Sequence, residues 1–264
     1  MGGPLQDEEL ERYSRHIILK EVGGAGQAKL KAAHVLIVGA GGLGAPLLQY
    51  LVAAGVGTIT LVDDDTVALS NLQRQVIYRA DRLGESKVAE AKSFAQALNP
   101  ALVLDAKAVR LSSSNAESLI DATDIVADGS DNFDTRFLVA DVAAHLHKPL
   151  VSAALGQFDG QISTFKPYQQ REKSGLPGQH TPPCYRCLFP APPEGAVENC
   201  AEGGILGAVA GVMGTLQATE VLKEILGIGD SLAGKLLLYD ALGARHRTVR
   251  FPRDPACVFC SGKV

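Results

Sequence analysis

The chain has 264 residues, of which 46% are hydrophobic and 20% are charged, and its formal net charge is −4. This length suits one large α/β domain or two small ones, and the weakly acidic balance argues against nucleic acid as a direct partner. The longest apolar run, at about 205–216, is shorter than the roughly 20 residues of a membrane span. Residues 1–10 lack the apolar core of a signal peptide, so we expect a cytoplasmic protein without membrane contact.

The first 155 residues alternate between helical and strand patterns. A helical arm is predicted over 7–32, with an interruption at Gly23–Gly26. Strands are predicted at 34–39, 58–63, 101–109, 124–129 and 149–154, and helices at 43–54, 85–98 and 133–147. Strands that alternate with helices favour βαβ units and a parallel sheet.

The pattern changes after residue 155. Residues 160–165, 235–242 and 245–251 alternate as antiparallel strands do, and a long helix is predicted at 205–226. Residues 167–183 and 189–204 are rich in proline, glycine and polar residues and are predicted to be loops. We therefore expect a single α/β domain over 1–264, in which a mainly parallel sheet is continued by antiparallel strands. Its parts are the helical arm 1–32, a nucleotide-binding half 33–155 and a mixed-sheet half 156–264.

A glycine cluster follows the first predicted strand. The sequence GAGGLG at 39–44 matches G-x-G-x-x-G through Gly39, Gly41 and Gly44, with Gly42 as an additional glycine, and it opens a helix. Such glycines let the backbone approach a phosphate, and the helix N-terminus adds partial positive charge. Asp63, at the end of the next strand, is placed to bind a ribose. Taken alone, this motif favours a dinucleotide.

Further polar side chains follow the second and fourth strands. They are Asp65, Asn71, Arg74, Lys87, Asp131 and Asn132. Ligands of doubly wound sheets bind outside the carboxyl ends of the strands, so these residues are expected to face one crevice. Cations neutralise a triphosphate and a carboxylate holds Mg²⁺, which favours ATP over a dinucleotide. Two plainer interpretations stay open: surface charges for Arg74 and Lys87, and a helix cap for Asp131.

The cysteines predict a metal site. Cys184 and Cys187 form one C-x-x-C pair and Cys257 and Cys260 another, with 69 residues between the pairs. Four thiolates in two such pairs are typical of tetrahedral, structural Zn²⁺, which we place in the 156–264 half. A redox role is not favoured, because neither pair opens a helix in a thioredoxin-like βαβ context.

The fifth cysteine, Cys200, lies in NCAEGGILG shortly before the long helix. A helix N-terminus lowers a thiol pKa and favours the nucleophilic thiolate. The alternative is a small, packed and inert cysteine.

Several of these stretches together resemble the ThiF/MoeB/HesA family, bacterial relatives of ubiquitin-activating enzymes. They are RYSRHIIL, GAGGLG, SNLQRQ, SDNFDTR, CYRC and CVFC, and they span about 8–261 in the family's order. The resemblance implies a Rossmann-like ATP-binding fold with a mixed sheet, usually as a homodimer. It also implies adenylation of the C-terminal Gly-Gly carboxylate of a ubiquitin-like sulfur carrier, with release of pyrophosphate.

The resemblance also implies residue roles. The implied ATP contacts are Gly41, Asp63, Asn71, Arg74, Lys87, Asp131 and Asn132, with Asp131 also placing Mg²⁺. Arg15 would reach into the partner subunit's site, the four paired cysteines would bind zinc, and Cys200 would be a thioester or persulfide nucleophile in some members. Because the chain ends at Val264, without room for a rhodanese domain, we expect a separate sulfur donor of cysteine desulfurase or rhodanese type.

The chemistry agrees with this resemblance. A terminal carboxylate has a pKa of about 3.5 and is already ionised at neutral pH, so its attack on ATP needs no general base. The barrier is the approach of two anions, which cations and Mg²⁺ lower by position and charge. An NAD-dependent oxidoreductase and a non-catalytic binding module are the alternative hypotheses. The sequence leaves the carrier open among molybdopterin, thiamine, cysteine and tRNA-thiolation pathways.

Overall fold

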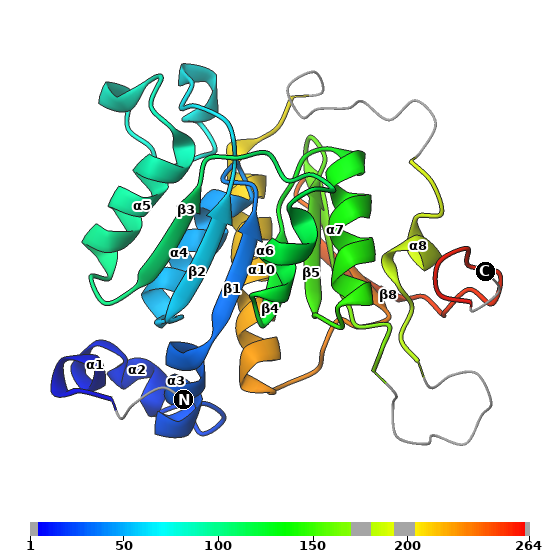
Figure 1. Cartoon of the computed structure of the whole chain (residues 1–264), viewed down its shortest axis with the longest axis horizontal. Coiled ribbons are helices and arrows are strands. Elements are labelled where there is room, and N and C mark those ends of the chain that lie inside the picture. The colour runs from blue at the N-terminus through cyan, green and yellow to red at the C-terminus, as the bar shows by residue number, and fades with distance from the viewer. Residues whose placement is uncertain (1–4, 170–180, 193–203, 262–264) are drawn as a thin grey trace.

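A central sheet with helices on both faces organises the chain (Figure 1). The computed structural model describes residues 5–169, 181–192 and 204–261. The strands of the sheet are β1 (His34–Val38), β2 (Thr58–Val62), β3 (Val103–Lys107), β4 (Ile125–Asp128), β5 (Leu150–Leu155), β6 (Asp159–Phe165), β7 (Lys235–Asp240) and β8 (Arg245–Arg250). Their order is β3-β2-β1-β4-β5-β6-β7-β8. Pairing is parallel from β3 to β5 and antiparallel from β5 to β8, which confirms the predicted mixed sheet.

Helices cover both faces of the sheet, and further helices lie in the N-terminal arm and at 185–188. The helices are α1 (Asp7–Arg12), α2 (Ser14–Ile17), α3 (Gly23–Ala32), α4 (Gly44–Ala54), α5 (Lys87–Leu98), α6 (Ala116–Asp121), α7 (Phe133–His145), α8 (Tyr185–Leu188) and α10 (Gly207–Leu226). Helices α4, α5 and α10 share one hydrophobic core with the sheet, and α6 and α7 share the other. No helix in the described part of the chain is long and apolar enough to span a membrane.

Burial on both faces explains why the first strands are continuous apolar runs. In β1, Val35 and Ile37 belong to the core under α4 and α10, while Leu36 and Val38 belong to the core under α6 and α7. Successive side chains of a strand point to opposite faces, so a strand covered on both sides needs apolar residues at every position.

The helical arm differs from its prediction. The sequence predicted an interruption at Gly23–Gly26, whereas the break lies at 18–22 and α3 begins at Gly23. Gly23 has a φ of 59°, a left-handed conformation that lets the chain turn into α3. The glycines therefore start this helix and do not interrupt it.

Strand order reverses between β1 and β4, because β2 follows β1 to one side and β4 lies on the other. At such a switch point the loops after the strands diverge and leave a crevice. The first turn of α10 reaches this edge: a Cβ on Gly42 would lie 3.4 Å from the Cβ of Ala210. The fold thus brings the glycine turn and the start of α10 to the same end of the sheet.

Candidate functional site

A cavity of about 720 Å³ opens at the carboxyl ends of β1, β2 and β4. Its walls come from the glycine turn, the 63–65 segment after β2, the 109–111 segment after β3 and the 129–136 segment after β4. The lining includes Gly39, Gly41, Gly42, Asp63, Asp65, Asn71, Arg74, Lys87, Asp131 and Asn132. The structure thus brings nearly all residues predicted for the nucleotide site into one cavity.

The glycine turn is shaped by close backbone approaches. Gly39 has a φ of 91°, and a Cβ on Gly44 would collide with the carbonyl oxygen of Gly39. At Gly41 and Gly42, added Cβ atoms would lie 3.6 Å from Gln75 Nε2 and 3.3 Å from Arg74 Cδ. A ligand bound against this turn would therefore lie close to the side chains of Arg74 and Gln75.

Asp63 ties the end of β2 to the glycine turn. Its Oδ2 accepts the N–H of Ala40 at 2.7 Å, and its Oδ1 accepts the N–H of Asp65 at 2.8 Å. Burial raises the pKa of Asp63, and the Ala40 N–H and the charge of Lys87 offset part of that rise. The carboxylate is held at the mouth of the turn, where a ribose hydroxyl would donate to it.

The raised pKa of Asp63 predicts a pH dependence of stability. The folded protein holds this proton more tightly than the unfolded chain, so the stabilisation is present below the ordinary carboxyl pKa of 3.8 and is lost as pH rises through the raised value. We expect Asp63→Asn to abolish this loss. Urea unfolding of both proteins between about pH 3 and pH 7 measures it. Asp64→Asn, at an exposed neighbour, is the control. Parallel stability curves for wild type and Asp63→Asn would contradict the assignment.

Two cationic side chains line the same cavity, and they differ in burial and in their partners. Lys87 has a side chain only 4% exposed, and its Nζ lies 2.8 Å from Oδ2 of Asp65. Arg74 is half-buried and donates to the carbonyl oxygen of Ser70 at 3.1 Å. Within the described ranges no carboxylate forms an ion pair with Arg74, so its charge stays available to a ligand.

The end of β4 separates two neighbouring roles. Asn132 caps α7, because its Oδ1 accepts the N–H of Thr135 at 2.9 Å. The sequence analysis left open whether Asp131 caps this helix, and the structure shows that Asn132 is the cap. Asp131 is exposed and lines the cavity, where a carboxylate suits a divalent cation.

Asp128, which the sequence analysis did not select, organises this turn from below. It is fully buried; its Oδ1 accepts the N–H and the hydroxyl of Ser130 at 3.0 and 2.7 Å, and its Oδ2 accepts the hydroxyl of Ser152 at 3.0 Å. Arg136 adds two bonds to the carbonyl oxygen of Ser130, at 3.1 and 2.8 Å. A polar residue closing an apolar strand was the available signal for Asp128.

Arg15 is not part of this chain's own cavity. It is exposed on α2, and the preceding residues bind the far end of α5: Arg12 donates to the carbonyl oxygen of Leu98 at 3.0 Å, and Asn99 donates to the Tyr13 hydroxyl at 2.9 Å. Because α5 begins with Lys87 at the cavity, its twelve residues place the arm about 18 Å away along the helix. Figure 1 shows the arm below the sheet, at the opposite edge.

The paired cysteines converge although 69 residues separate them in the sequence. The Sγ of Cys184 lies 3.6 Å from those of Cys187 and Cys257, and Cys187 Sγ lies 3.4 Å from Cys260 Sγ. Hydrogen bonding from Cys184 and from the N–H of Asp254 lowers the pKa of Cys187. Four thiolates bound to one ion at about 2.3 Å would stand roughly 3.8 Å apart, so the cluster fits Zn²⁺. Cys200 lies outside the described residues.

The parallel strands whose order reverses at β1, the glycine turn and the polar cavity define a doubly wound α/β protein with a crevice of the nucleotide-binding type. The chain belongs to the ThiF family, whose model matches residues 13–259. This confirms the resemblance found in the sequence.

Similar proteins carry consistent names. A "Sulfur carrier protein adenylyltransferase" of Thermus thermophilus is 52% identical over 254 residues, covering 96% of this chain and 91% of that protein. A "SAMP-activating enzyme E1" of Haloferax volcanii is 44% identical, covering 97% of this chain and 90% of that protein. Among solved structures, E. coli MccB with ATP has the same fold, with a TM-score of 0.79 at 22% identity over 95% of this chain and 75% of that one.

Proposed function

We propose that this protein uses ATP to adenylate the C-terminal Gly-Gly carboxylate of a ubiquitin-like sulfur-carrier protein and releases pyrophosphate. The observation that carries this proposal is the 52% identity, over nearly the full length of both chains, to the protein named "Sulfur carrier protein adenylyltransferase". The cavity supports it, because the glycine turn, the Asp63 carboxylate and two cations line one space. The names of the relatives do not favour the alternative of an NAD-dependent oxidoreductase.

The reaction matches what the cavity offers. An oxygen of the carrier carboxylate forms a bond to the α-phosphorus of ATP, the bond from that phosphorus to the bridging oxygen breaks, and pyrophosphate leaves with both electrons. Arg74 and Lys87 would offset the negative charge of the phosphates while the second anion approaches. The glycine turn and Asp63 would hold the α-phosphate and ribose in place.

Asp131 is the residue proposed to hold Mg²⁺, and Asp63 and Asp65 line the same cavity. Exposed carboxylates that face a phosphate site are the oxygen ligands that this ion takes in ATP sites. When bound, Mg²⁺ would supply further positive charge to the phosphates. Asn132 would keep its capping role and thereby fix the turn that carries Asp131.

Exchange of labelled pyrophosphate into ATP tests the proposal. It should occur with wild-type protein and a carrier that ends in Gly-Gly, and it should disappear when the carrier lacks its last glycine. Several carriers from sulfur-transfer pathways should be tried. Absence of exchange with all of them, or tight NAD binding by calorimetry without ATP–Mg²⁺ binding, would contradict the proposal.

We further propose that the four paired cysteines hold one structural Zn²⁺, which ties residues 184–187 to the C-terminal segment. Mass spectrometry of the native protein should find one zinc per chain. Cys257→Ser should lose it and lower the melting temperature by roughly 10 °C, the effect of about 3–4 kcal/mol in a chain of this size. Cys200→Ser is the matched control and should keep the metal. Equal zinc content in both variants would contradict the site.

The remaining proposals concern partners. We propose a homodimer in which Arg15 enters the partner subunit's cavity, which agrees with its distance from its own. A separate sulfur donor, of cysteine desulfurase or rhodanese type, would act on the adenylated carrier in the cytoplasm. The carrier's pathway stays open among molybdopterin, thiamine, cysteine and tRNA thiolation. The role of Cys200 as a thioester or persulfide nucleophile stays a prediction.

A further inference from the structure

The first half of α10 has an outer side without charge. Residues 207–218 contain no charged side chain. Ala208 is exposed, and Gly211, Val212 and Thr215, at helical spacing from it, are only half-buried. These four residues are called the α10 face below. A helix side that meets water normally carries charged or polar residues, so the α10 face has the composition of a surface that another protein covers.

Gly211 lies on this face without a reason inside the chain. Two other glycines of α10 allow close packing: a Cβ on Gly207 would collide with the carbonyl oxygen of Gln73, and a Cβ on Gly214 would collide with Pro46. A Cβ on Gly211 would meet no atom within 4 Å. Glycine inside a helix costs about 1 kcal/mol relative to alanine. Its benefit at this position is that the backbone of a second helix can approach closely.

An exposed apolar group lies at the start of α10, on the rim of the cavity. Leu206 precedes the helix and is exposed, and the residue before it lines the cavity. Leu69 is 69% exposed, four residues before Gln73. Because Gln73 packs on Gly207, this loop lies against the first turn of α10. Leu69 and Leu206 are called the rim group below.

A second apolar group lies at the other end of α10, on the helical arm. Lys29 donates to the carbonyl oxygen of Leu226, the last residue of α10, at 3.1 Å. On the same arm Ile18 is 70% exposed, and Leu19 beside it is exposed as well. Arg15 is exposed near them, and within the described ranges its guanidinium forms no ion pair or hydrogen bond. Arginine with apolar neighbours is typical of protein interfaces, from which most other charged residues are depleted.

We propose that the α10 face packs against the α10 face of a second copy of this chain, with the two helices antiparallel about a two-fold axis. Such an axis through the middle of α10 exchanges its two ends, so the arm of each chain meets the rim group of the other. Figure 1 shows α10 running from the cavity end of the sheet to the end where the arm lies. Arg15 thereby adds a cation to the cavity of the other chain. This inference rests on the proposed adenylating homodimer and names the surface that forms it.

The size and the self-complementarity of the surface favour a second copy as the occupant. Helix α10 has 20 residues and is about 30 Å long. A stable interface buries about 800 Å² per partner, a patch roughly 30 Å across. A carrier bound at the rim group would leave the arm, at the far end of α10, uncovered, whereas a two-fold axis covers both ends with one contact.

Sedimentation equilibrium tests the surface without the reaction. Wild-type protein should be a dimer, whereas Gly211→Arg and Thr215→Arg should be monomers, because a two-fold axis brings each added charge close to its own copy. Both variants should fold, because the space at Gly211 is open and Thr215 is only half-buried. Circular dichroism checks this. Ser118→Arg, at an exposed position of α6 on the other face of the sheet, is the matched control and should stay dimeric.

Complementation tests whether Arg15 acts in the other chain. Arg15→Ala and Asp131→Ala should each lower pyrophosphate exchange by about 10²-fold or more. When the two variants are co-expressed in equal amounts, half of the dimers are mixed, and one of the two sites in each mixed dimer has both an intact cavity and an Arg15 from the other chain. Exchange should therefore return to about one quarter of the wild-type rate. The same pair with Gly211→Arg in both chains should recover none.

Dimeric Gly211→Arg and Thr215→Arg variants would overturn the proposed surface. Monomeric wild-type protein would overturn it too, and weaker carrier binding by the same variants would then assign the α10 face to the carrier. Mixed dimers, isolated through two different affinity tags, that exchange no pyrophosphate would exclude the contribution of Arg15 to the other chain. Failure of the adenylation function itself is distinguishable, because wild-type protein would then exchange no pyrophosphate with any carrier while sedimentation still reports the dimer.

Discussion

Replacing Arg74 by alanine is expected to reduce ATP–pyrophosphate exchange by about 10²–10³-fold, the cost of removing one charge that stabilises a transition state. Arg74 lines the cavity beside Gly42, and among the described residues its guanidinium donates only to the carbonyl oxygen of Ser70. Its charge is therefore directed at the ligand and contributes little to folding. Arg74→Lys should recover only part of the rate, because an ammonium lacks the planar pair of donors that binds a phosphate.

Arg79→Ala is the matched control for this experiment. Arg79 lies five positions further along the same loop, is exposed, and pairs with Asp81 at 2.7 Å outside the cavity. Surface pairs of this kind contribute little, so exchange and melting temperature should stay near the wild-type values. Equal losses in both variants, or exchange by Arg74→Ala above half of the wild-type rate, would show that Arg74 does not act on the nucleotide.

The strands of the sheet could be predicted because burial on both faces leaves a simple mark in the sequence. The continuous apolar runs at β1, β2 and β4 each end within one residue of the prediction. The alternating runs at β7 and β8 were likewise identified as antiparallel strands. The short helix α6 was missed, because six residues carry too little periodicity to stand out.

The polar residues of the cavity could be predicted for a topological reason. The carboxyl ends of parallel strands meet at one edge, so Asp63 after β2 and Asp131 after β4 were expected to share a crevice. The sequence does not show which hydrogen bonds each of these side chains makes. Asn132 and Asp131 are adjacent polar residues, and only the geometry shows that Asn132 takes the cap.

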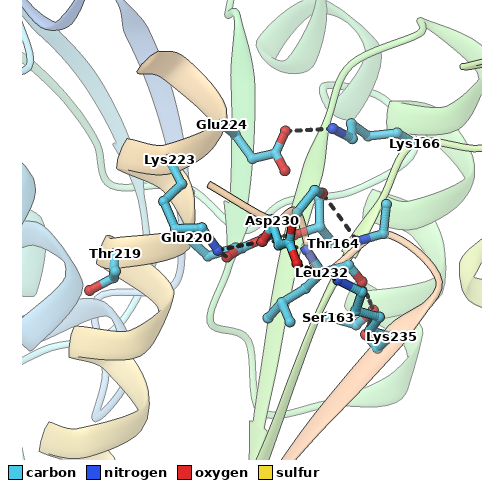
Figure 2. A network of polar contacts seen from close by, with 12 residues as sticks. Ser163, Thr164, Lys166, Thr219, Glu220, Lys223, Glu224, Asp230, Leu232 and Lys235 are labelled. Atoms are coloured by element: carbon cyan, nitrogen blue, oxygen red, sulfur yellow. Dashed lines mark hydrogen bonds and ion pairs between the residues drawn. The ribbon is translucent and has the colours of Figure 1, made fainter. Parts of the chain in front are cut away.

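Buried polar residues were the least predictable. Gln75 follows Arg74 in a polar loop, and nothing in the sequence distinguishes a buried amide there from an exposed one. Glu220 lies in the helix predicted at 205–226, and the sequence did not show that this carboxylate is buried inside the protein, where it is 3% exposed. Figure 2 shows it at the centre of a network that joins α10 to β6 and to the segment before β7.

Glu220 binds three partners through its two carboxylate oxygens. Its Oε1 accepts the Thr164 hydroxyl at 2.9 Å and the N–H of Leu232 at 2.7 Å, and its Oε2 accepts from Lys223. A second ion pair, between Lys166 and Glu224 at 2.7 Å, lies one turn further along α10 (Figure 2). These contacts fix the return of the chain from α10 to β7, which completes the antiparallel part of the sheet.

Glu220→Ala is expected to lower the free energy of unfolding by about 2–4 kcal/mol, because it leaves the buried Thr164 hydroxyl and the Leu232 N–H without their acceptor, while Lys223 keeps the carbonyl oxygen of Asp230. Glu220→Gln should cost less, since its amide oxygen still accepts from Leu232. Thr219→Ala is the control: Thr219 points away from the network and donates only within α10, to the carbonyl oxygen of Thr215. Urea unfolding measures all three variants. If Glu220→Ala unfolds at the same urea concentration as Thr219→Ala, the network does not stabilise the join between α10 and the sheet.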